Sequence, residues 1–171
     1  MGGRKSRNVG ERTQTSAGVA WGSGAGHGAG MMSLVLADLE ATEALGARVA
    51  RALRAGDVVL LEGPLGAGKS ALARAILRTL TGNAALEVPS PTYTLVQSYD
   101  TPIGSVAHFD LWRLEGAPDL AELGWDEADV ALVEWPDRLG ALRPEEALTI
   151  ALAAEGDGRR ATASGWEGRP L

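Results

Sequence analysis

From Ala41 on, apolar residues recur every four positions, and they predict an amphipathic helix over residues 41–53. Gly56 follows this stretch and is typical of the residue that ends a helix in a left-handed conformation. A short apolar run over 57–62 then predicts a buried strand. A glycine-rich loop over 63–68 separates this strand from a second predicted helix, 69–80, whose apolar residues again recur every four positions. The pattern thus defines a strand, a glycine-rich loop and a helix in direct succession.

Short apolar segments separated by turn residues dominate the second half of the chain. Turn sequences over 100–104 and 156–158 each predict a β-hairpin. A continuous apolar run at 130–133 is typical of a parallel strand buried on both faces. The other expected elements are strands over 93–99, 105–110, 147–154 and 159–164, a short helix over 118–123, and one or two helical turns over 137–142. This order predicts an α/β fold with a mixed central sheet, flanking helices and β-hairpins.

Composition divides the chain into one folded part and two flanking segments. Residues 1–30 are rich in glycine, serine and alanine without periodicity, which predicts a disordered N-terminal extension. One hypothesis is that this extension is translated from a start codon upstream of the natural one, since Met31 and Met32 stand where the pattern begins. We expect one domain over 31–165, for which an apolar share of 45% is sufficient, and a C-terminal tail over 166–171.

Charge and cysteine content exclude several kinds of protein. The extension carries a charge of +3 and the remainder −9, so the acidic body is a poor binder of nucleic acid by itself. The chain has no cysteine, which excludes disulfides, thiolate nucleophiles and cysteine-ligated zinc. No stretch approaches the roughly 18 consecutive apolar residues of a membrane span, and residues 1–30 lack the apolar centre of a signal peptide. These features favour a protein of the reducing cytoplasm, without a membrane partner.

The glycine-rich loop and the two residues after it, in the form GPLGAGKS at 63–70, match the Walker A pattern at every fixed position. Glycines let backbone N–H groups turn inward around phosphate oxygens, and the start of the following helix adds partial positive charge. Lys69 is the one lysine of the folded part, and its ammonium suits the β- and γ-phosphates. The Ser70 hydroxyl is a hard oxygen ligand suited to Mg²⁺. The motif therefore predicts a P-loop NTPase-like fold that binds a nucleoside triphosphate with magnesium.

Two of the predicted strands end in acidic residues. Glu134 directly follows the run 130–133, which is the arrangement of a Walker B acid that holds Mg²⁺ directly or through water. Asp110 ends the other strand, and three roles are open for it. It orients an attacking water, it contacts the ligands that surround the metal, or it is a surface carboxylate paired with Arg113. His108 alternates with Asp110, so we expect it on the same side of the strand as a supporting residue.

The sequence leaves the use of two further groups of residues open. Residues 90–92, Ser-Pro-Thr, form either a switch ordered by nucleotide, with the Thr92 hydroxyl near the γ-phosphate, or the plain start of a strand. Trp112, Trp125 and Trp135 gather around the acidic segment either as core anchors or as an exposed interaction face.

Taken together, these motifs resemble the TsaE family, formerly called YjeE, the bacterial ATPases of tRNA threonylcarbamoyladenosine biosynthesis. The resemblance covers about residues 35–155 and rests on GPLGAGKS at 63–70, SPTYTLV at 90–96, HFDLWRL at 108–114, ELG at 122–124 and VEWP at 133–136. This ordered set is far more specific than Walker A alone. Trp112 stands where the family usually has tyrosine, Ser70 where threonine is commoner, and residues 1–30 match nothing in the family.

The resemblance implies magnesium-dependent ATP hydrolysis in partnership with the proteins TsaB and TsaD. The process served is the threonylcarbamoylation of adenosine 37 in tRNAs that read codons beginning with A, and tRNA is reached through the complex. By family pattern Lys69, Asp110 and Glu134 are catalytic, and Ser70 and Glu134 hold Mg²⁺. The residues expected to contact ATP, with Thr42 beside the adenine, are Thr42, Gly63, Gly66, Ala67, Gly68, Lys69, Ser70, Ala71, Thr92 and Trp135.

Two rival functions are weighed against this one. A small-molecule or nucleoside kinase usually adds an arginine-rich lid, whereas only Arg113, Arg138 and Arg143 lie between the switch and the C-terminal hairpin. A nucleotide-gated binding module that does not hydrolyse ATP is disfavoured by the presence of both Asp110 and Glu134.

Overall fold

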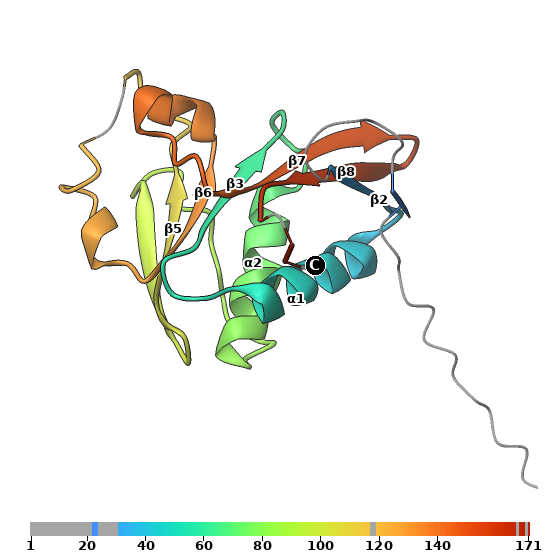
Figure 1. The fold of residues 1–171 in the computed structure, drawn as a ribbon, viewed down its shortest axis with the longest axis horizontal. Coiled ribbons are helices and arrows are strands. Elements are labelled where there is room, and N and C mark those ends of the chain that lie inside the picture. Colours follow the sequence, from blue (N-terminus) through green and yellow to red (C-terminus); the bar gives the residue numbers. More distant parts are fainter. Residues whose placement is uncertain (1–21, 24–30, 117–118, 167, 170) are drawn as a thin grey trace, which may run out of the picture.

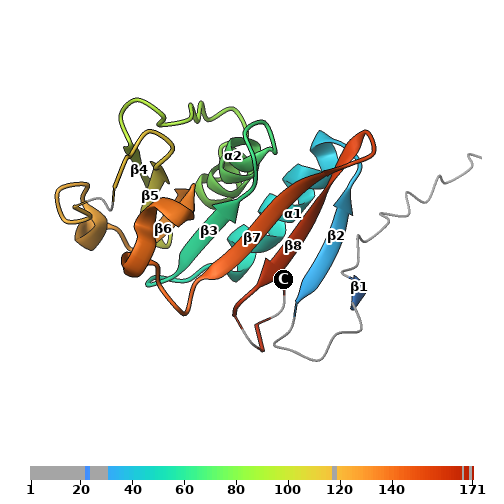
Figure 2. The ribbon, with the colours of Figure 1, turned by 90° about the horizontal axis from the view of Figure 1, so that it is seen from above.

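The two predicted amphipathic helices form, and they pack side by side on one face of a single sheet (Figures 1 and 2). The structure, a computed structural model, describes residues 22–23, 31–116, 119–166, 168–169 and 171. Helix α1 spans Leu39–Ala52 and begins at Asp38, whose carboxylate accepts a hydrogen bond of 2.8 Å from the Ala41 N–H. Helix α2 spans Lys69–Thr81 and ends at Gly82 in a left-handed conformation.

The strands form one mixed sheet in the order β1-β2-β8-β7-β3-β6-β5-β4. In this sheet β3 is parallel to both of its neighbours, β6 and β7, and β5 is parallel to β6. Among the described residues the strands are β1 (Gly22–Ser23), β2 (Met32–Leu36), β3 (Val58–Glu62), β4 (Val96–Thr101), β5 (Gly104–Asp110), β6 (Val130–Glu134), β7 (Leu148–Glu155) and β8 (Gly158–Ser164). The predicted hairpins form as β4–β5 and β7–β8.

Two apolar cores hold the layers together because side chains of successive strand residues point to opposite faces. The larger core lies between the helices and the sheet and includes the fully buried Leu45 and Ile76. The smaller core lies on the opposite face of the central strands, where η2, a 3-10 helix over Pro136–Leu142, contributes Leu139. This helix, drawn in orange in Figure 1, confirms the predicted turns over 137–142. The α/β fold of P-loop NTPase type is thus confirmed, with its central strands covered on both faces.

The parallel strands bring the predicted site residues to one edge of the sheet. Leu61 of β3 is the register partner of Glu134 at the end of β6, and Asp110 at the end of β5 pairs with Glu134 from the other side. The loop after β3 leaves the sheet at the same edge (Figure 2). The strand order therefore places the phosphate loop next to the acidic ends of β5 and β6, as expected for ligand sites at the carboxyl ends of parallel strands.

Two predicted elements are wrong in type or bounds. The helix over 118–123 does not form: Pro118 lies outside the described residues, and Asp119–Gly124 makes hydrogen-bonded turns that lead into a 3-10 helix, η1, over Trp125–Glu127. The strand expected from Tyr93 starts only at Val96, because Leu95 has a φ of +67° and residues 92–94 form a turn.

Strand β2 was not predicted, since its five residues carry too short a pattern to stand out from the preceding glycine-rich stretch. It forms by antiparallel pairing with β8, more than a hundred residues away in the chain. Of the predicted disordered extension, only Gly22 and Ser23 lie among the described residues, and they pair with β2 as β1. The rest of that prediction falls outside the described residues.

The described residues of the predicted tail pack against the domain. Trp166 contacts the larger core, and the Arg169 guanidinium pairs with the Asp57 carboxylate at 2.5 and 3.1 Å. The carbonyl oxygen of Leu171 accepts a hydrogen bond from Arg48 of α1. Neither α1 nor α2, nor any other helix in the described ranges, combines the length and apolarity that a membrane span requires.

Candidate functional site

The phosphate-loop sequence folds into a tight turn between β3 and α2. Gly63 has a φ of +133°, and a Cβ at this position would lie 2.3 Å from the carbonyl oxygen of Leu152 in β7. Gly68 caps the start of α2 with a φ of +104°. Both positions therefore need glycine, one for space and backbone conformation, the other for conformation alone. The turn places the N-terminus of α2, with its free N–H groups, at the edge of the sheet where Glu134 and Asp110 lie.

Lys69 is buried beneath this loop, with 4% of its surface exposed. Its ammonium donates hydrogen bonds to the carbonyl oxygens of Gly63 at 2.7 Å and Pro64 at 2.9 Å. It also lies 3.9 Å from the centre of the Trp135 ring, a cation–π contact. Burial lowers the pKa of Lys69 below 10.5, and the negative charges of Glu134, Asp110 and Asp137 partly oppose that shift.

Trp135 adopts a left-handed backbone conformation, with φ of 60° and ψ of 52°, directly before Pro136. Such a conformation costs a bulky residue about 1–3 kcal/mol and is found where surrounding structure enforces it. Here it turns the indole ring onto the Lys69 ammonium and against the Trp112 ring, whose centre is 4.2 Å away. The strained backbone of Trp135 therefore places two aromatic rings beside the buried Lys69 ammonium.

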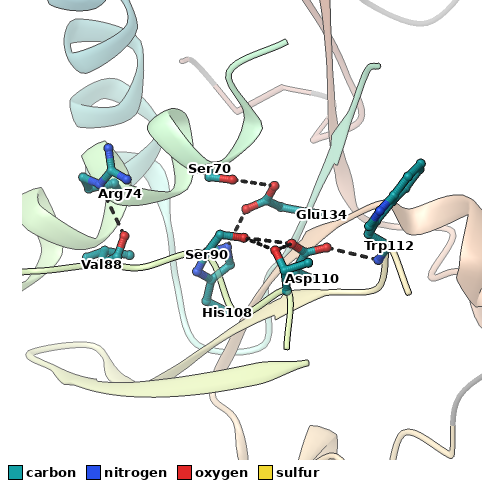
Figure 3. Close-up of polar contacts among 9 residues, drawn as sticks. Ser70, Arg74, Val88, Ser90, His108, Asp110, Trp112 and Glu134 are labelled. Atoms are coloured by element: carbon teal, nitrogen blue, oxygen red, sulfur yellow. Dashed lines mark hydrogen bonds and ion pairs between the residues drawn. The ribbon is translucent and has the colours of Figure 1, made fainter. Parts of the chain in front are cut away.

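A hydrogen-bonded row of side chains joins α2 to the two acidic strands (Figure 3). The Ser70 hydroxyl donates to Glu134 Oε2 at 2.9 Å. The other carboxylate oxygen, Oε1, lies 2.9 Å from Nε2 of His108, which is fully buried in β5. Glu134 itself is 2% exposed, so both of its oxygens are held by protein groups in a desolvated setting.

Asp110 binds the segment over residues 90–92, for which the sequence left a switch and a plain strand start open. Its Oδ2 lies 2.8 Å from the Ser90 hydroxyl and 2.7 Å from the Thr92 hydroxyl, and these two hydroxyls are 2.9 Å apart. Its Oδ1 accepts a hydrogen bond of 3.0 Å from the backbone N–H of Trp112 (Figure 3). Asp110 is 3% exposed, and the guanidinium of Arg113 lies instead over the Tyr93 ring. The alternative of a surface carboxylate paired with Arg113 is therefore wrong.

These groups face one cavity of about 400 Å³. Its walls come from the phosphate loop, the first turn of α2, the 90–92 segment and the ends of β5 and β6. The lining residues are Leu65, Gly66, Gly68, Lys69, Ser70, Ala71, Ser90, Thr92, Asp110, Trp112, Glu134 and Trp135. Most of the predicted nucleotide-binding residues are therefore brought together around a single space.

Three predicted nucleotide-binding residues lie away from this cavity. Gly63 lines a separate hollow of about 390 Å³, which shares Trp135 with the phosphate-loop cavity. Ala67 is buried within the loop, and its N–H donates to the Pro64 carbonyl at 3.1 Å. Thr42 is buried on α1, where its hydroxyl donates to the Asp38 carbonyl at 3.2 Å.

A larger hollow of about 590 Å³ runs between α1 and α2 and shares Ala71 with the phosphate-loop cavity. Its lining is rich in alanine, with Glu40 and Glu43 on α1 and Arg74 and Arg78 on α2. The smaller cavity is nevertheless the better candidate site, because the buried ammonium, both buried carboxylates and the start of α2 face it.

The donor set of this cavity fits magnesium bound together with phosphate. Nowhere in the described ranges do three or more His, Cys, Asp or Glu side chains gather as a metal cage. Ser70 Oγ and Glu134 Oε2 are two hard oxygen donors 2.9 Å apart at the cavity wall. Mg²⁺ commonly takes one or two protein oxygens of this kind and completes its octahedron with phosphate oxygens and water.

Sequence reasoning missed several contacts of the site. Trp112 and Trp135 both line the cavity, where Trp135 was expected as an ATP contact and Trp112 was not, whereas Trp125 packs against Phe109 in the smaller core. Trp112 follows Asp110 by two residues, and this spacing was the available signal. Arg159 of β8 donates to the Gly66 carbonyl at 3.4 Å, a contact from the far end of the chain that no local pattern indicates.

Comparisons with known proteins agree with this geometry. The sequence model of the family described as threonylcarbamoyl adenosine biosynthesis protein TsaE matches residues 36–162. A TsaE of Rickettsia felis is 33% identical over 130 residues, covering 74% of this chain and 75% of that protein. A TsaE of Synechocystis is 39% identical over 120 residues, covering 65% of this chain and 74% of that protein. The crystal structure of Bacillus subtilis YdiB superposes with a TM-score of 0.68 at 27% identity, covering 84% of this chain and 91% of that one. A motif set, a fold and relatives that all coincide lead to one conclusion: the chain belongs to the TsaE family of tRNA threonylcarbamoyladenosine biosynthesis proteins.

Proposed function

We propose that this protein is a magnesium-dependent ATPase that supports threonylcarbamoylation of adenosine 37 in tRNAs reading codons that begin with A. The observation that carries the proposal is one cavity in which a buried ammonium, a helix N-terminus and a serine–carboxylate pair face each other. The ammonium and the helix N-terminus suit the negative charge of a triphosphate, and the serine–carboxylate pair suits its metal ion. A protein of this pathway would act in the cytoplasm.

The phosphate loop and Lys69 bind and orient the triphosphate in this proposal. The loop supplies inward-facing N–H groups, and Lys69 supplies charge at the β- and γ-phosphates. Lys69 is already desolvated, so its attraction for a phosphate oxygen is stronger than that of an exposed lysine. Ser70 and Glu134 would hold Mg²⁺, which when bound neutralises charge on the transferring phosphoryl group.

Asp110 couples the 90–92 segment to the state of the cavity. Both hydroxyls of that segment point at one carboxylate oxygen of Asp110, and Thr92 lines the cavity. A γ-phosphate that attracts the Thr92 hydroxyl competes with Asp110 for it. This favours a role for Ser90 and Thr92 as a switch over that of a plain strand start.

TsaB and TsaD are the partners that we propose, with tRNA reached through them. The body of the chain carries a charge of −9, which disfavours direct binding of tRNA phosphates. Turnover of ATP in this protein would then reset a cycle in the partner complex.

The testing experiment measures phosphate release from ATP by the purified chain, alone and with TsaB, TsaD and tRNA. We expect slow magnesium-dependent release by the chain alone, faster release with the partners and tRNA, and loss of both in a Lys69→Ala variant. Phosphate transfer to an added small-molecule acceptor would favour a kinase instead. ATP binding without release under any condition would favour a nucleotide-gated binding module.

A further inference from the structure

His108 is a buried titratable residue next to the site, and the proposed function gives it no role. It lies in the middle of β5 with no exposed surface, two residues before Asp110. Its Nε2 is 2.9 Å from Glu134 Oε1, on the side of the carboxylate opposite to Ser70 (Figure 3). His108 does not line the phosphate-loop cavity. The ring therefore meets the site through Glu134 alone among the cavity-lining residues.

The chemistry of the contact fixes the direction of the hydrogen bond. An ionised carboxylate only accepts, so Nε2 of His108 must carry the hydrogen. Nδ1, at the other side of the ring, is buried and has no hydrogen-bond partner among the described residues. With hydrogen on Nε2 alone the ring leaves an unpaired acceptor at Nδ1, whereas the opposite tautomer would leave an unpaired donor there and break the bond to Glu134. The site therefore selects one tautomer.

We propose that His108 is a positioning residue that holds the Glu134 carboxylate in the orientation needed for magnesium. With Glu134 Oε1 fixed by His108, Oε2 faces the Ser70 hydroxyl. Glu134 Oε2 and Ser70 Oγ are the proposed metal ligands. This inference rests on the proposed function. It adds that the affinity for metal depends on a residue that never contacts the metal.

The expected size of the effect follows from comparable sites. A glutamate side chain has several rotatable bonds, and without its partner on Oε1 it samples orientations in which Oε2 leaves Ser70. Loss of a residue that orients a metal ligand typically lowers metal affinity about 10- to 100-fold. Binding of nucleotide without metal depends on the loop and Lys69 and should stay unchanged.

Two amide substitutions separate positioning from mere filling of the core. The side-chain nitrogen of glutamine is as many bonds from Cα as Nε2 of histidine, so His108→Gln keeps a donor within reach of Oε1. Asparagine is one bond shorter and places its nitrogen near the Nδ1 position, so His108→Asn is equally polar but cannot reach. The readout is Mn²⁺ binding by electron paramagnetic resonance, on protein saturated with ADP, with metal-free ADP binding and thermal unfolding measured alongside.

We expect His108→Gln to bind Mn²⁺ within about threefold of the unchanged protein, and His108→Asn to bind it about 10- to 100-fold more weakly. Equal Mn²⁺ affinity in the two variants overturns the proposal, because it assigns His108 to packing alone. A measurement on the unchanged protein stands beside this: the nitrogen-15 spectrum of His108 should show hydrogen on Nε2. A spectrum without hydrogen on Nε2 would equally overturn the proposal. Failure of the unchanged protein to bind Mn²⁺ with ADP would instead refute the proposed function itself, and with it this inference.

Discussion

Replacing Asp110 with asparagine tests how the cavity controls the 90–92 segment. The change keeps the shape of the side chain but removes its charge. Two hydroxyls and one backbone N–H now donate to the carboxylate, at 2.7 to 3.0 Å. A hydrogen bond to a charged group contributes about 1.5–3 kcal/mol, against about 0.5–1.5 kcal/mol for a neutral one. Three such bonds weaken together in Asp110→Asn.

The net loss in the free energy of unfolding should be about 1–3 kcal/mol, since the neutral amide costs less to bury than the carboxylate. For a chain of this size each kcal/mol shifts Tm by about 2–4 °C, so a loss of about 2 kcal/mol lowers Tm by about 4–8 °C. The pKa of Lys69 should also fall further, because Asp110 is one of the charges that oppose its lowering.

The assay is thermal unfolding together with hydrogen exchange of the backbone N–H groups in the segment 90–95, where every residue except Pro91 has one. In Asp110→Asn we expect faster exchange confined to that segment. Asp137→Asn is the matched control, because Asp137 also acts on Lys69 through its charge but its side chain is 71% exposed and contacts neither Ser90 nor Thr92. Exchange at 90–95 that is unchanged in Asp110→Asn, or equally faster in Asp137→Asn, would refute the assigned contact.

Four further predictions concern the phosphate loop and the proposed metal ligands. Lys69→Ala should abolish ATP binding or turnover, and unchanged turnover in a phosphate-release assay would contradict its role. Because burial lowers the pKa of Lys69, ATP affinity measured by calorimetry should fall as pH rises toward 10.5, and it should fall at a lower pH than for an exposed lysine. Over the same pH range the Lys69 side chain of the unfolded chain binds more protons than that of the folded chain, so this group makes the free energy of unfolding rise with pH. Glu134→Ala should reduce magnesium-dependent turnover more than metal-free nucleotide binding, and equal losses in both assays would count against it as a ligand. Gly63→Ala should prevent folding or lower Tm strongly, because its Cβ would meet a carbonyl at 2.3 Å, whereas Gly66→Ala meets no atom and should cost only about 1–2 kcal/mol for its left-handed backbone; similar circular-dichroism melting curves for the two variants would contradict this.

Local patterns predicted the parts of the fold whose causes are local. The helices follow from four-residue spacing, the two hairpins from turn residues, and the phosphate loop from glycines that the backbone conformation requires. The convergence of Glu134 and Asp110 was also accessible, since parallel strands end at one edge of a sheet. Strand β2 was not, because only its pairing with β8 makes it a strand.

Contacts between distant segments decided the rest of the site. That Asp110 binds Ser90 and Thr92 rather than Arg113 depends on how the 90–95 turn folds back onto β5. The position of Trp135 depends on a strained backbone that no propensity predicts. Thr42, expected beside adenine, keeps its hydroxyl on its own helix, so the contact of the base stays a prediction.

The most direct test of the central claim is a calorimetric comparison of ATP, ADP and AMP binding, with and without Mg²⁺. If the loop and the buried Lys69 ammonium bind the β-phosphate, ATP and ADP bind and AMP binds far more weakly. Lys69→Ala should then remove this difference in affinity between the nucleotides. Equal affinity for all three nucleotides, or ATP binding that survives in Lys69→Ala, would contradict it.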